Sequence, residues 1–358
     1  MRPYNIEIFA PDFQMVGNSN IDAITYKEDY LSNDVNTITI LPIVGVNKQD
    51  YIRISRGKEE YAGVITEITY GTDKSKSLMQ ISYKPFVEIF NTDILFDVDV
   101  QGTGSLEGYI ASAITEMFIN NEDEAQNIKG LSVVTTSSTE DWYFHITPRD
   151  SGGHYNIVNL MDSIIIPALS KYSVVVEVKL DIQNRALNVS VGRAGAGTMI
   201  IETDLPNIVK KELTIKSVSA DVNKLVLYNP ESDYQEKKVY YLHAKDLSYD
   251  TKNVDRITPV NCEMRTVSLE EGGSFDSAAI QEAYNVFANL SYSNLIELTM
   301  LNGDSLIKPT EIPFGQVVSI LSDGVAYTSI LTGKEIGKTT KLIFGTVRLD
   351  LTKILRRE

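Results

Sequence analysis

The first 95 residues alternate between hydrophobic and polar positions in short runs. The clearest runs are 4–8, 37–40, 51–54, 63–70 and 78–83. They are rich in β-branched and aromatic residues and are separated by polar turns, as strands usually are. Many short strands with little helix between them predict a small antiparallel barrel or sandwich.

The pattern changes to a helical period after residue 97. Ser105 is a good N-cap, and it precedes hydrophobic residues spaced three and four apart, which predict one face of an amphipathic helix: Leu106, Ile110, Ile114, Met117 and Phe118. A second helix is predicted over about 155–165, ended or kinked by Pro167. Residues 173–180 and 186–191 then predict a hairpin, so this middle section is α+β.

The last third returns to strands around one helix. Residues 216–227 have strand character, and a helix is predicted over about 274–290. Ser274 would cap it, and its apolar face would hold Ile280, Ala283, Tyr284 and Phe287. Five strands are predicted after it, over 295–300, 316–321, 326–331, 342–344 and 347–351.

The two ends of the chain resemble each other. Residues 51–90 and 317–355 both contain a strand, a glycine-containing turn, a strand that opens with tyrosine (Tyr61 or Tyr327), a second polar turn and a long strand. The shared order of elements favours an internal repeat. Chance similarity between two hairpin systems is the alternative.

Composition and charge exclude several classes of function. Of 358 residues, 33 are basic and 48 acidic, which gives a net charge of −15. Such a surface repels phosphate, so we expect no sequence-specific nucleic-acid binding. Cys262 is the single cysteine, which excludes an internal disulfide. The chain has no apolar run of the ~20 residues that a membrane helix needs, so we expect no membrane insertion.

Several short motifs resemble catalytic or binding motifs but lack the residue spacing that those motifs require. The run 333–340 has only three residues between its glycines, where a phosphate-binding loop needs four. Asp150, Ser151 and His154 lie too close along one turn for a hydrolytic triad. His145 and His154 could share a metal with Asp150, but no third nitrogen or sulfur ligand lies at a usual spacing. We therefore predict no catalytic, cofactor-binding or metal site, and we expect the protein not to be an enzyme.

Three segments carry a family resemblance: 50–54 through 61–65, the 171–193 hairpin after a helix, and 314–318 through 327–329 to 344–345. With the repeat, they resemble the baseplate hub family of tailed bacteriophages, which includes the N-terminal part of siphophage tail-associated proteins. The resemblance implies a β-rich α+β fold with two similar small antiparallel β-barrels and an inserted α+β region. The first barrel would be 1–95, the second 208–229 plus 295–358, and the insertion 96–207 plus 230–294.

The resemblance also implies a role. Three chains would present six barrels, and this homotrimer would adapt a sixfold tail tube to a threefold tip and line a channel for DNA. Its partners would be the distal tail or tail-tube ring and a spike, fibre or tape-measure protein. It would lie at the virion tail tip after assembly in the bacterial cytoplasm. The candidate assembly contacts are Tyr61, Gly63, Tyr327 and Gly333.

Two other functions stay open from the sequence alone. A β-rich adhesin or carbohydrate-binding module would have the same strand pattern. A cell-wall hydrolase could use acidic residues of the middle section, although two carboxylates on opposite sides of a cleft cannot be identified from sequence.

Overall fold

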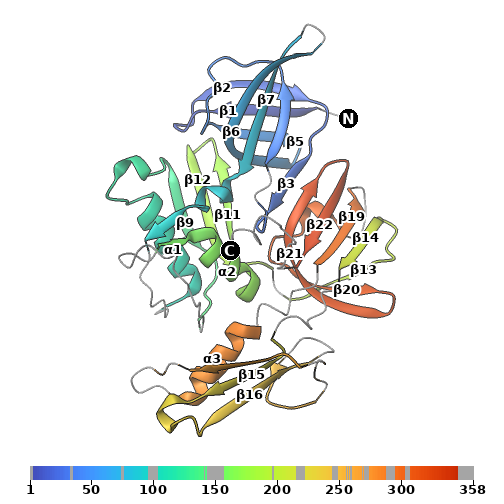
Figure 1. Ribbon diagram of the computed structural model, residues 1–358. Helices are drawn as coiled ribbons and strands as arrows, with labels where there is room; N and C mark the ends of the chain where they lie inside the picture. Colours follow the sequence, from blue (N-terminus) through green and yellow to red (C-terminus); the bar gives the residue numbers. More distant parts are fainter. Residues whose placement is uncertain are drawn as a thin grey trace.

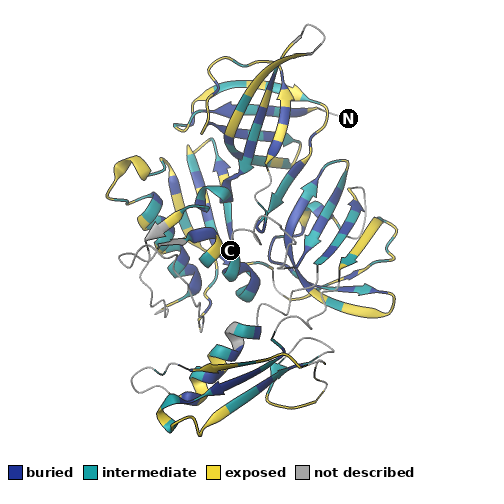
Figure 2. Cartoon of the chain, in the orientation of Figure 1, coloured by how far each residue is buried: buried dark blue, intermediate teal, exposed yellow. Residues whose placement is uncertain are grey.

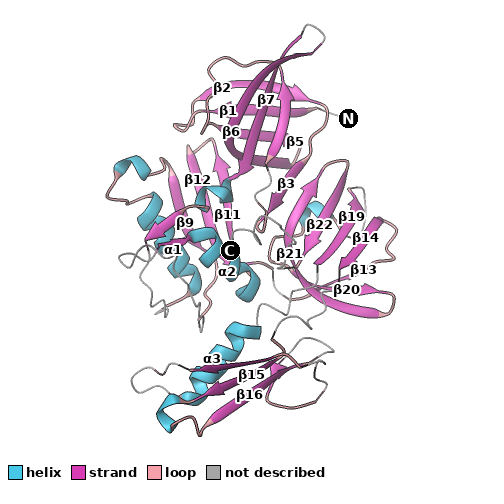
Figure 3. Cartoon of the chain, in the orientation of Figure 1, coloured by secondary structure: helices cyan, strands magenta, loops and turns pink. Residues whose placement is uncertain are grey.

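The computed structural model describes residues 3–32, 35–73, 76–95, 104–140, 142, 157–195, 197–214, 222–243, 249–254, 256, 258, 260–267, 269, 274–287, 295–302 and 307–345. Over these residues the protein is β-rich, with the helices α1, α2 and α3 between groups of strands (Figures 1 and 3). The predicted β-rich α+β class is therefore confirmed.

The N-terminal sheet is curved like half a barrel, and its strands run antiparallel in the order β2-β1-β5-β6-β7-β4. The strands are β1 (Tyr4–Phe9), β2 (Met15–Ile21), β4 (Asn36–Ile40), β5 (Tyr51–Arg56), β6 (Glu59–Asp73) and β7 (Lys76–Pro85). The hydrophobic positions of the alternating runs, such as Ile6, Ile52, Ile54 and Ile81, pack into one core. The period of two places them on a single face of the sheet.

The middle of the chain forms a three-stranded sheet with helices beside it. The sheet has the order β11-β12-β9, from β11 (Val174–Asp181), β12 (Ala186–Arg193) and β9 (Leu131–Thr135). The helices are α1 (Leu106–Phe118) and α2 (Ile166–Tyr172), the latter preceded by a π-helical turn, Met161–Ile165. Short elements complete this part: the 3-10 turns Phe86–Phe90 and Glu124–Gln126, and the paired strands β8 (Asp93–Leu95) and β10 (Ile157–Asn159).

The second large sheet has the order β13-β20-β21-β22-β19-β14. Its strands are β13 (Met199–Glu202), β14 (Ile208–Thr214), β19 (Leu295–Leu301), β20 (Val317–Ser322), β21 (Val325–Ile336) and β22 (Thr339–Phe344), and the 3-10 turn Pro309–Glu311 precedes β20. β3 (Tyr26–Asp29), from the N-terminal part of the chain, pairs with β21. We expected a purely antiparallel second barrel. This expectation is wrong for one pair of strands, because β13 and β20 are parallel. The sheet shares one continuous core with the middle section.

A fourth sheet, drawn at the bottom of Figure 1, has its own small core. Its order is β17-β16-β15-β18, from β15 (Lys224–Tyr228), β16 (Lys237–Leu242), β17 (Tyr249–Asp250) and β18 (Cys262–Thr266), and the 3-10 turn Pro230–Ser232 joins β15 to β16. α3 (Phe275–Phe287) covers one face, on which Leu225 and Leu227 are fully buried. Figure 2 shows buried residues along the strands of this sheet and on the helix beside it.

Most local predictions are confirmed. α1 begins after Ser105, whose side chain accepts a hydrogen bond from the Gly108 N–H. The predicted hairpin is β11–β12. Ser274 accepts a hydrogen bond from the Ser277 N–H and so caps α3.

Two helix predictions are wrong in part. Within the helix predicted over 155–165, residues Ile157–Asn159 form strand β10, and the helical turns run from Met161 to Tyr172. Pro167 does not end them, because it lies where the π-helical turn Met161–Ile165 passes into α2 and the helical turns continue to Tyr172. Ile280 is exposed, because the buried stripe of α3 runs through Phe275, Ala279, Ala283 and Phe287 at steps of four. Of Tyr284 only the backbone is described, and 215–221 and 347–351 lie outside the described residues.

Four strands of the two large sheets repeat the same arrangement. The order β5-β6-β7-β4 in the first sheet corresponds to β20-β21-β22-β19 in the second, and both sets are antiparallel. The pairing registers also match, because Ile54 faces Tyr61 as Ile320 faces Tyr327. Each long strand carries a bulge at the corresponding place, between Ile65 and Glu67 in β6 and between Leu331 and Gly333 in β21.

Candidate assembly surface

The two candidate tyrosines occupy corresponding positions but different surroundings. Tyr61 is the third residue of β6 and Tyr327 the third residue of β21. The ring of Tyr61 packs 4.7 Å from that of Tyr26 on β3, and burial, followed by the charge of Glu59, raises its pKa well above the ordinary value. Tyr327 is half-buried against the large shared core. Both rings contribute to packing within the chain, and their role as contacts between copies stays a prediction.

The two candidate glycines lie where strands approach closely. A Cβ on Gly63 would overlap the backbone carbonyl oxygen of Lys84 on the neighbouring strand β7. A Cβ on Gly333 would lie 2.8 Å from the carboxyl group of Asp29 on β3. Both positions are buried. Glycine is therefore explained at both by packing inside the chain, and contact between copies again stays a prediction.

A cluster of charged and aromatic side chains forms where β3 lies against β21 and β11, and sequence reasoning missed it. Glu28 faces Lys334 in the β3–β21 register, and the hydroxyl of Tyr26 donates to the Glu28 carboxylate at 3.3 Å. The ammonium of Lys334 donates to the carbonyl oxygen of Thr310 at 3.3 Å and lies 4.9 Å from the ring centre of Phe314. Residues Ser329–Lys334 are all buried, without the alternation of a strand that has one exposed face, so the sequence pattern gave no signal for a buried Lys334.

Burial controls the charge states in this cluster. Burial raises the pKa of Glu28 to about 7, partly opposed by the positive charge of Lys334, while Glu177 on β11 adds to the rise. Burial lowers the pKa of Lys334, and the two carboxylates oppose that shift. The hydroxyl of Tyr30 donates to the carbonyl oxygen of Val176 at 2.6 Å, which ties the end of β3 to β11. The β3–β21 pairing and the Tyr30–Val176 hydrogen bond therefore join three parts of the chain around the buried Lys334.

A cavity of about 580 Å³ lies beside the bulge of β6, between the first sheet and α1. Its polar lining includes Gln49, Thr66 and the pair Lys84–Glu88, whose charged groups are 3.7 Å apart. The facing wall is apolar, with Met117 and Phe118 from α1.

The motifs considered for chemistry have structural explanations where they are described. The run 333–340 forms the β21–β22 hairpin, and Trp142 is buried with its indole N–H donating to the carbonyl oxygen of Gly104 at 2.9 Å. His145, Asp150, Ser151 and His154 lie outside the described residues. Over the ranges that the structure describes, His, Cys, Asp and Glu side chains do not gather into a metal-binding group. No helix in those ranges combines the length and apolar character needed to cross a bilayer.

No family model matches the chain, and no curated protein matches its sequence. Solved structures match it along almost its whole length. A tail protein from Neisseria meningitidis MC58 has a TM-score of 0.56 at 9% identity, covering 96% of this chain and 97% of that one. The 43 kDa tail protein of prophage MuSo2 from Shewanella oneidensis has a TM-score of 0.54 at 12% identity, covering 97% and 98%. Prophage tail protein gp18 from Listeria monocytogenes EGD-e has 0.50 at 14% identity, covering 98% and 97%.

The chain therefore has the fold of phage and prophage tail proteins, and the resemblance inferred from its sequence is confirmed at the level of structure. The identities of 9–14% explain why the sequence comparisons found nothing.

Proposed function

We propose that this protein is a structural component of a phage or prophage tail, the hub that joins the tail tube to the tip. The observation that carries the proposal is the match to tail proteins over nearly the full length of both chains. The match to tail proteins supports the tail role, and we propose that this chain lies at the virion tail tip after assembly in the bacterial cytoplasm.

The repeated strand order supports a more specific role. We propose that residues 1–95 form one barrel-like unit, 208–229 plus 295–358 a second, and 96–207 plus 230–294 an insertion. Two strands pair across the boundaries between these units. β3, from the first unit, pairs with β21 of the second, and β13, from the insertion, pairs with β20 of the second. Two similar units in each chain of a homotrimer would offer six similar docking surfaces to a sixfold tube, while the far side stays threefold.

The proposed partners follow from this geometry. The six units would contact the distal tail or tail-tube ring, and the threefold side would receive a spike, fibre or tape-measure protein. The net charge of −15 suits a channel wall that DNA passes without binding, because like charges repel. The hub acts by assembly, so the proposal assigns no cofactor and no catalytic residue.

The mass of the full chain in solution and the symmetry of its particles test the proposal. We expect trimers by light scattering and rings with three copies in electron micrographs, with tube protein added if the chain alone remains monomeric. Particles with a different copy number, or no ring in the presence of tube protein, would contradict the hub. Binding to a glycan array would favour the adhesin, and cleared zones on cell-wall gels would favour the hydrolase.

A further inference from the structure

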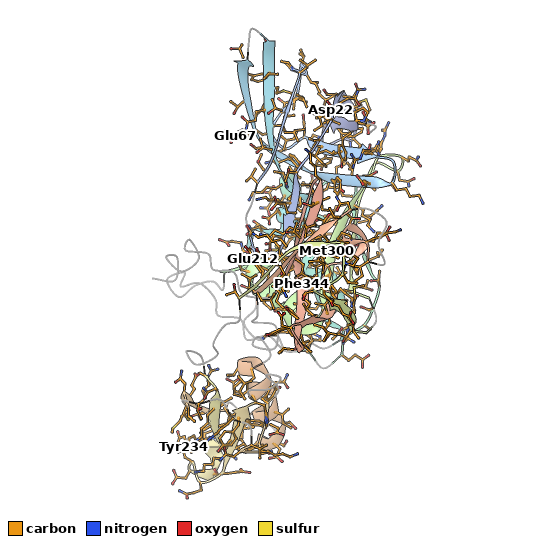
Figure 4. The ribbon with its side chains drawn as sticks, turned by 90° about the vertical axis from the view of Figure 1, so that its right-hand side faces the viewer. Asp22, Glu67, Glu212, Tyr234, Met300 and Phe344 are labelled. Carbon is orange, nitrogen blue, oxygen red and sulfur yellow. The ribbon has the colours of Figure 1, made fainter. Side chains whose placement is uncertain are left out.

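One backbone edge of β6 is open beyond its bulge. β5 pairs with β6 only as far as the pair Tyr51–Val64. From Glu67 to Asp73, β6 pairs with β7 on one side. On the other side, no backbone partner is found for this segment among the residues that the structure describes. The segment belongs to the long hairpin at the top of Figure 1, and Figure 4 labels Glu67 on it.

The corresponding edge of β21 is filled by a strand from elsewhere in the chain. After its bulge, β21 pairs with β22 on one side and with β3 on the other, from Gly333–Asp29 to Ile336–Tyr26. The bulge residues correspond, because Thr66 donates its hydroxyl to the carbonyl oxygen of Ser82 at 3.2 Å, and Thr332 donates to that of Ile343 at 3.3 Å. Counting from the bulges, Glu67–Tyr70 correspond to Gly333–Ile336.

The added strand changes how far the corresponding side chains are buried. Ile336, opposite Tyr26 of β3, is 6% exposed. Tyr70, at the corresponding position of β6, is 62% exposed. Figure 2 shows exposed positions along this part of the hairpin. A large aromatic ring therefore lies uncovered where the second sheet covers its counterpart.

The backbone groups on this edge can be assigned from the second sheet. The Tyr30 N–H donates to the Thr332 carbonyl oxygen at 3.1 Å, so Thr332 directs its backbone groups toward β3. Alternate residues of a strand face the same side, so Lys334 and Ile336 do likewise. By the same count, Ile68 and Tyr70 direct their N–H and C=O groups to the open edge of β6. An open edge of this kind is a template for an incoming strand.

We propose that a second copy of this chain adds a strand to the open edge of β6, antiparallel to Glu67–Tyr70, as β3 does on β21. Within one chain, the N-terminal part donates a strand to the second sheet. If the next copy donates a strand in the same way, that strand fills the open edge of the first sheet. A head-to-tail contact of this kind, repeated from copy to copy, forms a ring when the rotation between copies closes. The inference thus rests on the proposed self-assembly and names its contact.

Proline at Tyr70 tests the contact. Tyr70→Pro removes the N–H that the incoming strand needs, and proline is tolerated on an edge strand whose N–H faces solvent. Tyr70→Ala is the matched control, because it removes the ring and keeps the N–H. Light scattering over a concentration series measures assembly, and circular dichroism checks the fold. We expect Tyr70→Pro to raise the concentration for half-assembly by at least about tenfold, and Tyr70→Ala to raise it less.

Hydrogen exchange of the unmodified chain gives a second readout that needs no variant. The amides of Ile68 and Tyr70 should exchange quickly in the dilute monomer and become protected in the assembly. Assembly of folded Tyr70→Pro at the unmodified concentration would overturn the strand contact and leave the hub intact. Assembly without protection at Ile68 and Tyr70 would do the same. A chain that stays single in every condition, tube protein included, would overturn both proposals.

Discussion

Gly333 of β21 lies directly opposite Asp29 of β3, and the two come so close that a Cβ on Gly333 would lie 2.8 Å from the Asp29 carboxyl group. Asp29 is held in place, because its carboxylate accepts a hydrogen bond from the Leu31 N–H at 2.9 Å. The close contact lies within the β3–β21 pairing, which joins the N-terminal part of the chain to the second sheet.

Gly333→Ala should therefore loosen the β3–β21 pairing. We expect a loss of about 1–3 kcal/mol in the free energy of unfolding, as for other overpacked sites. Urea denaturation measures it. Gly337→Ala in the same hairpin is the control, because its Cβ would have no neighbour closer than 3.5 Å. Equal stability of the two variants would show that the Asp29 side chain can move away from the added Cβ without loss of stability.

Gly63→Ala should reduce the free energy of unfolding more than Gly333→Ala does. The added Cβ would overlap the backbone carbonyl oxygen of Lys84, which can move less than a side chain. We expect a loss of roughly 2–4 kcal/mol or failure to fold. Gly71→Ala on the same strand is the control, since nothing lies within 4 Å of its Cβ. A Gly63→Ala protein that keeps its stability but no longer assembles would instead support Gly63 as a contact between copies.

Glu28 should make stability depend on pH between about 4.5 and 7. Its pKa is raised to about 7 in the folded chain, so folding favours the protonated form. Its stabilising contribution is complete below the unfolded pKa and is lost as pH rises through 7. Glu28→Gln imitates the protonated carboxyl group, so the fall in stability over this range should shrink by about 1–3 kcal/mol.

Urea titrations at several pH values measure this change. Glu60→Gln on the exposed part of β6 is the matched control and should leave the profile unchanged. Parallel profiles for Glu28→Gln and the unmodified chain would show that Glu28 is hydrated in solution.

Glu107 should have the opposite effect in acid. Its carboxylate is fully buried at the start of α1 and accepts hydrogen bonds from the Ser137 hydroxyl, the Thr139 N–H and the Thr139 hydroxyl. Burial by itself raises its pKa, but these hydrogen bonds outweigh burial and hold the pKa below the ordinary value of 4.5. Its contribution is thus present above pH 4.5 and is lost as pH falls through the lowered pKa.

Glu107→Gln places an NH₂ group among these donors, and we expect a loss of about 1–3 kcal/mol at neutral pH together with a flatter acid limb of the stability profile. Glu116→Gln on the exposed face of α1 is the control. An unchanged acid limb in Glu107→Gln would contradict the assigned role of the carboxylate.

Local patterns in the sequence were sufficient to predict most of the individual helices and strands and the relation between the two ends of the chain. Alternation with period two was enough to locate most strands of the first sheet, and the spacing after Ser105 was enough to locate α1, because these patterns depend on which side of a strand or helix meets the core. The matched order around Tyr61 and Tyr327 indicated the repeat for the same reason.

The pairing of strands that lie far apart in the chain could not be predicted from these local patterns. β3 leaves its sequence neighbours for β21, β13 runs parallel to β20, and Glu28 meets Lys334 some 300 positions along the chain. Pairing between distant segments depends on how whole sheets pack, and a four-residue strand such as Tyr26–Asp29 has no local pattern that identifies its partner.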